Sequence, residues 1–218
     1  MKIFALLFLS AFSAASLVQA QNAETMPPAS TPTRSIELFN GRNFDGWTFF
    51  MRSNAAPEIT WSISNSFIHC AGKPNGFART QNSYRDYQCT VEWRFVKPGN
   101  TGVLVDMQLP DHVWPRCVEC QGMHDHQGDF WLWGGVAGNE PFNLQRNGIK
   151  MLQPSAENAV GEWNTYQTVC RSNSVEIIVN GKAMNKLTGC NVSEGFIGLQ
   201  SEGAEIEVRR VYLEPLKN

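Results

Sequence analysis

The chain has 218 residues, of which 42% are hydrophobic and 17% charged, and 18 Lys and Arg against 20 Asp and Glu give a formal net charge of −2. This apolar content suffices for a folded core, which excludes a disordered or collagen-like chain, and no positive excess exists to bind nucleic-acid phosphates. After the first twenty residues, no apolar run approaches the roughly 20 residues that a membrane-spanning helix needs. We expect a folded protein with no nucleic-acid partner and no membrane span.

The first twenty residues have the pattern of an export signal. A positive start at Lys2 precedes the apolar stretch 3–18, and Ala20 supplies the small residue that a signal peptidase requires. The alternative is an apolar N-terminal helix of the fold. We predict a cleaved signal peptide, a mature chain beginning near Gln21, and a periplasmic or secreted protein.

A change of composition marks the start of the folded domain. Residues 21–34 consist largely of Ala, Thr, Ser and Pro, which lack the apolar groups of a packed segment and therefore predict a flexible linker. The remaining chain has the length of one domain and shows no second change of composition. The prediction is a signal peptide over 1–20, a linker over 21–34 and a single domain over 35–218.

Short apolar or alternating segments separated by turn residues run through this domain. Apolar and polar residues alternate in 89–96, which is the period of a half-buried strand. Asn180-Gly181 lies between two extended segments and predicts a tight hairpin turn. Further strands are predicted at 103–107, 116–121, 175–179, 182–184, 196–200 and 206–209. Because no window of the domain has a convincing helical period, we predict an all-β sandwich of antiparallel sheets.

All six cysteines lie in the predicted domain, at Cys70, Cys89, Cys117, Cys120, Cys170 and Cys190. An exported chain meets an oxidising compartment, so disulfides are chemically possible, but the sequence does not choose their pairing. Cys117 and Cys120 have the spacing of a redox or zinc motif. On a strand these two side chains point to opposite faces, so we predict ordinary buried cysteines instead.

The sequence lacks the GxSxG, HExxH, phosphate-loop and GxGxxG motifs of common nucleophile, zinc and nucleotide sites. Polar residues gather instead at Asp106, Asp111, His112, Arg116, Glu119, Gln121, His124, Asp125, His126 and Asp129. If 116–121 is a strand, Glu119 and Gln121 share one open face while Val118 faces the core. That arrangement suits a general base beside an amide that binds hydroxyl groups. The alternative is a solvated sheet face with a polar loop.

His124 and His126 are spaced so that both imidazoles lie on one side of an extended chain. They could share a divalent metal with Asp106 or Glu119, and the alternative is two loop histidines in solvent. No other cofactor is predicted. His69, at the end of an apolar run, is predicted to be structural.

Seven tryptophans lie in the predicted domain. We assign Trp47, Trp61, Trp93 and Trp163 to the core. Trp114, Trp131 and Trp133 flank the polar residues instead. A flat indole beside carboxylates and amides suits a sugar, because the C–H face of the ring stacks on the aromatic and the hydroxyls bind the polar groups. Carbohydrate is therefore the predicted substrate class.

Several motifs occur in an order that resembles one known family. They are Leu38-Phe39-Asn40-Gly41, Gly46-Trp47, Asn100-Thr101-Gly102, Glu119-Cys120-Gln121, Gly161-Glu162-Trp163-Asn164, Asn180-Gly181 and 195–200. Over roughly 36–216 the chain is similar to the 3-keto-disaccharide hydrolase domain family. The sequence departs from the family at Asp106, where Arg or His is frequent, and at Glu202-Gly203, where His-Gly is frequent.

This resemblance implies a concanavalin A-like jelly-roll β-sandwich of two antiparallel sheets that acts on glycosides oxidised to a ketone at sugar carbon 3. Such a ketone acidifies the hydrogen on carbon 2, so a base can remove it and expel the aglycone from carbon 1, after which water adds. This path avoids the oxocarbenium-like transition state of ordinary glycosidases. It requires one base, one stabiliser of the enolate and one proton donor.

The hypothesis assigns these roles to residues near the Glu-x-Gln motif. The base is Glu119 or His126, the enolate stabiliser is Arg94 or a divalent metal held by His124 and His126, and the acid is His124 or Asp129. The predicted substrate-binding residues are Gln121, Trp131, Trp133, Trp114 and Asp106.

Two other classes of function stay open. A glycan-binding module on the same sandwich would use Trp131 and Gln121 without a base. An ordinary glycoside hydrolase would need two carboxylates on one strand face, but Cys117 and Gln121 occupy the positions that flank Glu119. The sequence does not indicate an oligomeric state.

Overall fold

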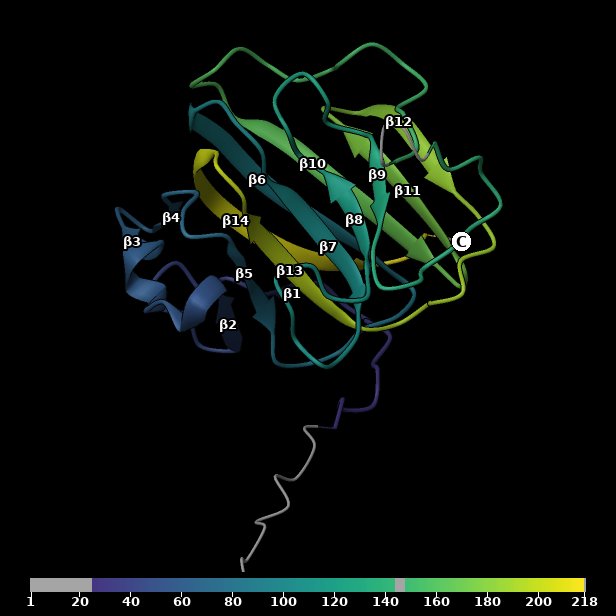
Figure 1. Cartoon of the computed structure of the whole chain (residues 1–218), viewed down its shortest axis with the longest axis horizontal. Helices are drawn as coiled ribbons and strands as arrows, with labels where there is room; N and C mark the ends of the chain where they lie inside the picture. Colours follow the sequence, from purple (N-terminus) through teal and green to yellow (C-terminus); the bar gives the residue numbers. More distant parts are fainter. Residues whose placement is uncertain (1–24, 144–147, 218) are drawn as a thin grey trace, which may run out of the picture.

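The computed structural model describes residues 25–143 and 148–217, so the predicted signal peptide lies outside the described residues. Within these ranges the chain forms fourteen strands and two short 3-10 helices (Figure 1). No helix of the described residues is long and apolar enough to cross a membrane. The elements are β1 (Ile36–Glu37), β2 (Trp47–Met51), η1 (Arg52–Asn54), η2 (Pro57–Ile59), β3 (Trp61–Ser64), β4 (Phe67–Cys70), β5 (Gly76–Thr80), β6 (Tyr87–Lys97), β7 (Gly102–Met107), β8 (Val118–Gln121), β9 (Phe130–Leu132), β10 (Asn164–Arg171), β11 (Ser174–Val179), β12 (Lys182–Leu187), β13 (Phe196–Ser201) and β14 (Glu205–Pro215).

The strands form two antiparallel sheets. One has eight strands in the order β12-β11-β10-β6-β14-β4-β3, with β1 paired to β14, and the other has six in the order β2-β5-β13-β7-β8-β9. In Figure 1, β7, β8 and β9 cross in front of β6, β10 and β11, as two layers. The predicted β-sandwich is therefore confirmed, and the turn at Asn180-Gly181 joins β11 to β12 as expected.

Alternation along the central strand β6 builds the core between the sheets. Val91, Trp93 and Phe95 are buried on one side of this strand. Val118 and Cys120 of β8 belong to the same core cluster, from the other sheet. Full burial of a large apolar side chain contributes roughly 1.5–3 kcal/mol. This shared core fixes which face of β8 points outward.

Three of the four tryptophans assigned to the core are buried there, namely Trp47, Trp61 and Trp93. The assignment of Trp163 is wrong, because its side chain is only partly buried and lies outside the core cluster. Its indole lies between the guanidinium groups of Arg94 and Arg209, at 4.7 and 4.6 Å from the ring centroid. On this outer face of the eight-stranded sheet, cation–π contacts cover Trp163 in place of core packing.

A second apolar cluster covers part of the outer face of the six-stranded sheet, and it consists of Phe77, Leu104, Met107, Cys117 and Phe196. Trp133 and Met26 pack against it. Cys117 therefore lies on the opposite face of the sheet from Cys120, as expected for a strand. All six cysteines are buried and none forms a disulfide.

Part of the predicted linker packs on the sandwich. Ser30 exchanges backbone hydrogen bonds with the segment 83–85, at 3.0 and 3.1 Å. The Ser83 hydroxyl donates to the carbonyl oxygen of Pro27 at 2.6 Å, and Met26 contacts the second apolar cluster. The described part of the linker, 25–34, is thus attached to the domain. Although this segment is mostly polar, one apolar side chain and a few hydrogen bonds hold it on the sandwich.

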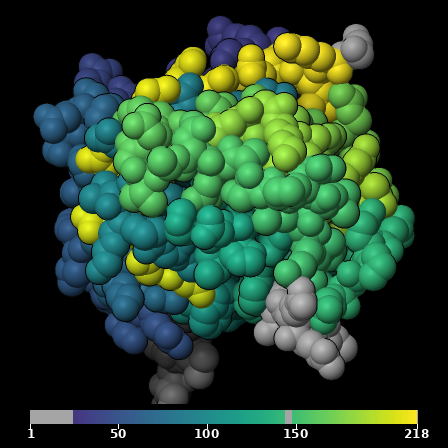
Figure 2. Space-filling view, turned by 90° about the horizontal axis from the view of Figure 1, so that it is seen from above, coloured from purple at the N-terminus to yellow at the C-terminus, as the bar shows by residue number. Residues whose placement is uncertain are grey.

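The surface of the sandwich combines segments that are far apart in the sequence. In Figure 2, yellow segments from the C-terminal part of the chain reach the surface between blue and teal segments from its first half. A site on such a surface cannot be found by scanning one stretch of sequence.

Candidate active site

Glu119 and Gln121 project from the middle of the six-stranded sheet. Val118 and Cys120 face the core, so the alternation of β8 directs Glu119 and Gln121 to the outer face, as the sequence predicts. Glu119 pairs across β8 and β9 with Trp131, which therefore stands beside it on the same face.

Tryptophans and carboxyl groups line a cleft over these two residues, which we call the Glu119 cleft. It has a volume of about 230 Å³ and is lined by Asn100, Trp114, Glu119, Gln121, Trp131, Trp133 and Glu202. The indole of Trp133 lies between those of Trp114 and Trp131, with both centroid separations at 5.7 Å and interplanar angles of 29° and 19°. These three indoles give the cleft the flat aromatic wall that the sequence predicts for sugar binding.

The glycine at the start of β7 packs closely against β8 beside Glu119. Gly102 lies opposite Gln121 in the sheet. A Cβ atom at this position would lie 3.2 Å from the Cys120 carbonyl oxygen and 3.4 Å from both the Glu119 Cγ and the Gln200 Oε1. Alanine would therefore fit here only with a small shift of its neighbours.

The carboxyl group of Glu119 is covered and held. Only 1% of the residue is exposed, and the Trp133 indole Nε1 donates a hydrogen bond to its Oε2 at 2.5 Å. Burial raises the pKa of Glu119 to about 8; hydrogen bonds from Trp133 and Gln200 oppose this rise, whereas the charge of Glu202 adds to it. The expectation of an open sheet face is corrected, because Trp133 folds over the carboxyl group.

Glu202 and Asn100 are the two residues of the cleft that the site prediction missed, and Glu202 is the ionisable one. Glu202 lies in the turn between β13 and β14, and the Asn100 Nδ2 donates a hydrogen bond to its Oε2 at 2.9 Å. Burial raises its pKa, and a hydrogen bond from Trp114 opposes the rise. In the sequence, Glu202 stood out only because it departs from the family pattern. Its closeness to Glu119 could not be predicted, because it depends on the order of the strands in the sheet.

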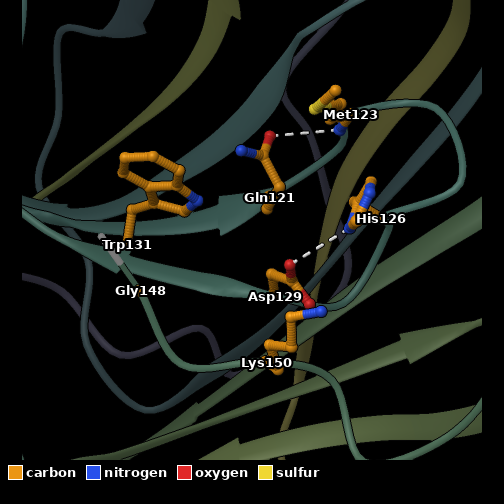
Figure 3. Close-up of a pocket in the computed structure, with 7 residues that line it drawn as sticks. All are labelled: Gln121, Met123, His126, Asp129, Trp131, Gly148 and Lys150. Atoms are coloured by element: carbon orange, nitrogen blue, oxygen red, sulfur yellow. Dashed lines mark hydrogen bonds and ion pairs between the residues drawn. The ribbon is translucent and has the colours of Figure 1, made fainter. Parts of the chain in front are cut away.

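A second hollow adjoins the Glu119 cleft, and we call it the His126 hollow (Figure 3). It has a volume of about 380 Å³ and is lined by Gln121, Met123, His126, Asp129, Trp131, Gly148 and Lys150. Gln121 and Trp131 line both spaces. The two therefore meet at these side chains and form one extended site.

Hydrogen bonds fix the polar groups of the His126 hollow. The Asp129 carboxylate accepts a hydrogen bond from the Met151 backbone N–H at 2.7 Å, and its other oxygen lies 3.4 Å from the His126 Nδ1. The Gln121 Oε1 accepts from the Met123 N–H at 3.0 Å. In Figure 3 the amide nitrogen of Gln121 points toward Trp131, where the two spaces meet.

Arg94 is not part of the site. It lies on β6 of the eight-stranded sheet, with Trp93 and Phe95 on its two sides facing the core. Its guanidinium therefore lies on the opposite outer face of the sandwich, where it bonds the Glu207 carboxylate at 2.6 Å. The predicted role as enolate stabiliser is wrong, because β6 belongs to the other sheet.

Asp106 is also excluded from substrate binding. Its φ of 53° interrupts the alternation of β7, and the residue is only 1% exposed. Val105 before it belongs to the core and Met107 after it to the outer apolar cluster, so the alternation reverses at Asp106. Asp106 lines neither the Glu119 cleft nor the His126 hollow. Burial raises the pKa of Asp106 to about 7, with further increases from Glu194 and Asp86.

The structure directs the two predicted metal ligands to different partners. His126 faces Asp129, whereas the His124 Nδ1 hydrogen-bonds the Glu157 carboxylate. His124, Asp125 and Glu157 place ligand atoms within 4.8 Å of one another. Both Glu157 oxygens already have partners, since the Asp125 N–H donates to the second at 3.0 Å. This cluster is therefore satisfied by its own hydrogen bonds, and none of its members lines either part of the extended site.

The fold of the sandwich resembles that of several solved structures. A candidate glycosyl hydrolase from Parabacteroides distasonis has a TM-score of 0.64 at 21% identity, over 84% of this chain and 94% of that one. The carbohydrate-binding module CBM66 from Bacillus subtilis gives 0.56 at 15%, over 78% and 95%. A Bacillus licheniformis β-glucanase gives 0.56 at 13%, over 84% and 99%. At these identities the likeness shows the fold, a jelly-roll sandwich of the glycosyl hydrolase and lectin type.

The family is narrower than this fold class. The model of the 3-keto-alpha-glucoside-1,2-lyase-like domain matches residues 34–214, and the chain belongs to that family. The family that the sequence motifs resemble is thereby confirmed, and with it a carbohydrate-active role. No curated protein matches the chain in sequence.

Proposed function

We propose that this protein cleaves glycosides carrying a ketone at sugar carbon 3, by elimination followed by hydration. The observation that carries the proposal is the buried carboxyl group of Glu119 under a wall of three indoles, in a chain of this family. The keto ring lies in the Glu119 cleft, stacked on the indoles, and the amide nitrogen of Gln121 binds one of its oxygens.

Glu119 is the base of the proposed reaction. Its carboxylate takes the proton from carbon 2, the electron pair of that C–H bond forms the enolate, and the enolate expels the C1 oxygen with its bonding pair. Water then adds across the new C1–C2 double bond, so the net reaction is hydrolysis. General-base catalysis of this kind contributes typically about 10²- to 10⁴-fold.

Glu202 is the proposed proton donor to the ketone oxygen. It is half-buried in the same cleft, and burial holds its pKa above the ordinary value, which favours the protonated form that can donate. Glu202 thereby takes the role of enolate stabiliser, which Arg94 cannot have because it lies on the other sheet. Asp129 orients His126 at the far side of Gln121, where His126 can protonate the leaving oxygen.

The test compares a chromogenic 3-keto-glucoside with its unoxidised parent, each with wild-type protein, Glu119→Gln and a control. Glu176→Gln serves as the control, because Glu176 lies on β11 of the other sheet. We expect aglycone release from the keto compound alone, unchanged in Glu176→Gln and at least about 100-fold slower in Glu119→Gln. Full activity of Glu119→Gln would remove the base assignment.

A second candidate function is ordinary glycoside hydrolysis. This function is supported by two carboxyl groups in one cleft, those of Glu119 and Glu202. The sequence did not predict this pair, because the second carboxyl group comes from a distant turn and not from the strand of Glu119. Release of aglycone from the unoxidised parent would favour it. Binding of sugar without release from either compound, unchanged in Glu119→Gln, would indicate a glycan-binding module.

A further inference from the structure

The indole at one end of the aromatic wall is carried by a loop. Trp114 lies between β7 and β8, whereas Trp131 belongs to β9 and Trp133 follows that strand directly. Trp114 is partly exposed, and its stacking on Trp133 is a contact between side chains that no strand pairing supports. Its position therefore depends on the other groups that contact it.

A cation lies over this indole. The guanidinium Cζ of Arg52 is 5.8 Å from the centroid of the Trp114 ring. The face of an indole attracts a cation within about 6 Å, because the ring quadrupole places negative charge there. Arg52 is exposed, and no carboxylate of the residues that the structure describes lies within ion-pair distance of it. Its contact with Trp114 therefore has no competing ion pair.

The backbone fixes the place of Arg52 at the end of β2. Its N–H donates a hydrogen bond to the Asn75 carbonyl oxygen at 2.8 Å, and its carbonyl oxygen accepts one from the Ala55 N–H at 3.3 Å. Ser53 and Asn54, which follow it, have φ values of 58° and 52°. Left-handed backbone is unfavourable for residues other than glycine and persists only where the surrounding contacts impose it. The turn therefore holds Arg52 beside the loop of Trp114 against this strain.

Trp114 connects the cation to the chemistry of the Glu119 cleft. Its indole is part of the wall on which the keto ring stacks, and it donates a hydrogen bond to the carboxyl group of Glu202. A displaced indole would remove both a binding surface and a donor to Glu202.

We propose that Arg52 is a positioning residue of the Glu119 cleft, which holds the Trp114 indole against Trp133 and beside Glu202. Arg52 lines neither the Glu119 cleft nor the His126 hollow, so it acts through the indole and not on the substrate. The proposal rests on the proposed function for the role of Glu202.

The first experiment measures kcat, KM and the pH profile of kcat/KM on a chromogenic 3-keto-glucoside. Arg52→Ala is expected to raise KM about two- to fivefold, the size of an exposed cation–π contact. The fall of the profile at high pH should move to higher pH, because Glu202 loses the hydrogen bond that lowers its pKa. Arg52→Lys should restore part of both effects, since an ammonium group also binds an indole face.

Arg42→Ala is the matched control. Arg42 is an exposed arginine between β1 and β2 and lines neither space, so its loss should change neither KM nor the profile. Values for Arg52→Ala equal to those of this control overturn the proposal while leaving the elimination activity intact.

A double-mutant cycle tests whether Arg52 acts through the indole. Trp114→Phe keeps an aromatic ring but removes the N–H group that donates to Glu202. In this background, Arg52→Ala should leave the fall of the profile where Trp114→Phe alone puts it. A further shift as large as that in the wild-type background would mean that the charge of Arg52 acts on Glu202 directly, which overturns the positioning role.

A measurement without substrate separates failure of this proposal from failure of the proposed function. If wild-type protein releases no aglycone, the function fails, and fluorine NMR of protein labelled with fluorotryptophan then tests the position of Trp114. The resonance that is missing in Trp114→Phe belongs to Trp114, and its shift between ordinary and heavy water reports the solvent exposure of the indole. A larger shift in Arg52→Ala than in wild type and Arg42→Ala supports the positioning role. Equal shifts in all three proteins reject it.

Discussion

At the level of single residues, the site depends on two carboxyl groups whose proton affinities are coupled. Glu119 has a pKa of about 8, mainly because it is buried and to a smaller extent because the negative charge of Glu202 disfavours its ionised form. A base must be ionised to act. The proposed activity should therefore depend on pH in a range where ordinary glutamates are fully ionised.

The first prediction concerns this pH dependence. For wild-type protein, kcat/KM on a 3-keto-glucoside should be bell-shaped in pH, because Glu119 must be ionised and Glu202 protonated. In Glu202→Gln the fall at high pH should be lost and the rise should shift to lower pH, since the amide neither titrates nor carries a charge. A profile in this variant that does not rise with pH would contradict Glu119 as the base.

Asp106 gives a prediction about stability. Burial lifts its folded-state pKa to about 7, above the ordinary value of 3.8, so the folded protein keeps a proton that the unfolded chain releases between these values. The free energy of unfolding therefore falls as pH rises from about 4 to about 7, by on the order of 4 kcal/mol from this residue. Above that range the loss is complete.

The measurement is denaturant unfolding of wild-type protein and Asp106→Asn at several pH values. Near pH 4 the two should have similar stability, because the wild-type side chain is protonated and neutral. Near pH 8 the variant should be more stable, since it has no buried carboxylate with an unpartnered oxygen. The same difference at both pH values would show that Asp106 does not titrate in this way.

At the level of elements, features that depend on a local sequence pattern could be predicted, whereas features that depend on strand order could not. The alternation in 89–96 and 116–121 is local, so it correctly predicted β6, β8 and the shared face of Glu119 and Gln121. Which sheet a strand joins depends on contacts between distant segments. For that reason Arg94 was placed wrongly, and Glu202 in a distant turn was missed.

The loop between β7 and β8 owes its position to a buried ion pair. Arg79 of β5 is 1% exposed and donates from its Nε to both oxygens of Asp111, at 2.9 and 3.0 Å. Its guanidinium also lies 4.1 Å from the Phe196 ring centroid. Because Asp111 and Trp114 belong to the same loop, this pair fixes one side of the aromatic wall.

We therefore predict that Asp111→Ala weakens both the fold and substrate binding. Removing Asp111 deletes the charge-assisted hydrogen bonds that its carboxylate accepts from Arg79 and costs about 1.5–3 kcal/mol. KM for the keto-glucoside should rise several-fold as Trp114 loses its position, with a smaller change in kcat. Glu194→Ala is the matched control, since the Arg85–Glu194 pair is exposed and 3.7 Å long. Equal effects of the two substitutions on unfolding would contradict this role.

At the level of the whole molecule, composition predicted one domain with its boundary near residue 35. The family match starts at residue 34, close to the predicted boundary at 35. Even so, Met26 and Ser30 contact the sandwich before that boundary. Export over 1–20 stays a proposal, which cell fractionation and N-terminal sequencing of the secreted or periplasmic chain would test.

The contacts of the N-terminal segment predict that a chain beginning at Ser35 is less stable than one beginning at Thr25. The shorter chain loses the backbone hydrogen bonds of Ser30 and the packing of Met26 on the second apolar cluster. These losses amount to about 1–3 kcal/mol, or a decrease of several degrees in Tm. Met26→Ser in the longer chain should reproduce part of the decrease. Because Trp133 packs against the second apolar cluster, aglycone release should also fall; equal Tm and activity of the two chains would restore the flexible-linker interpretation.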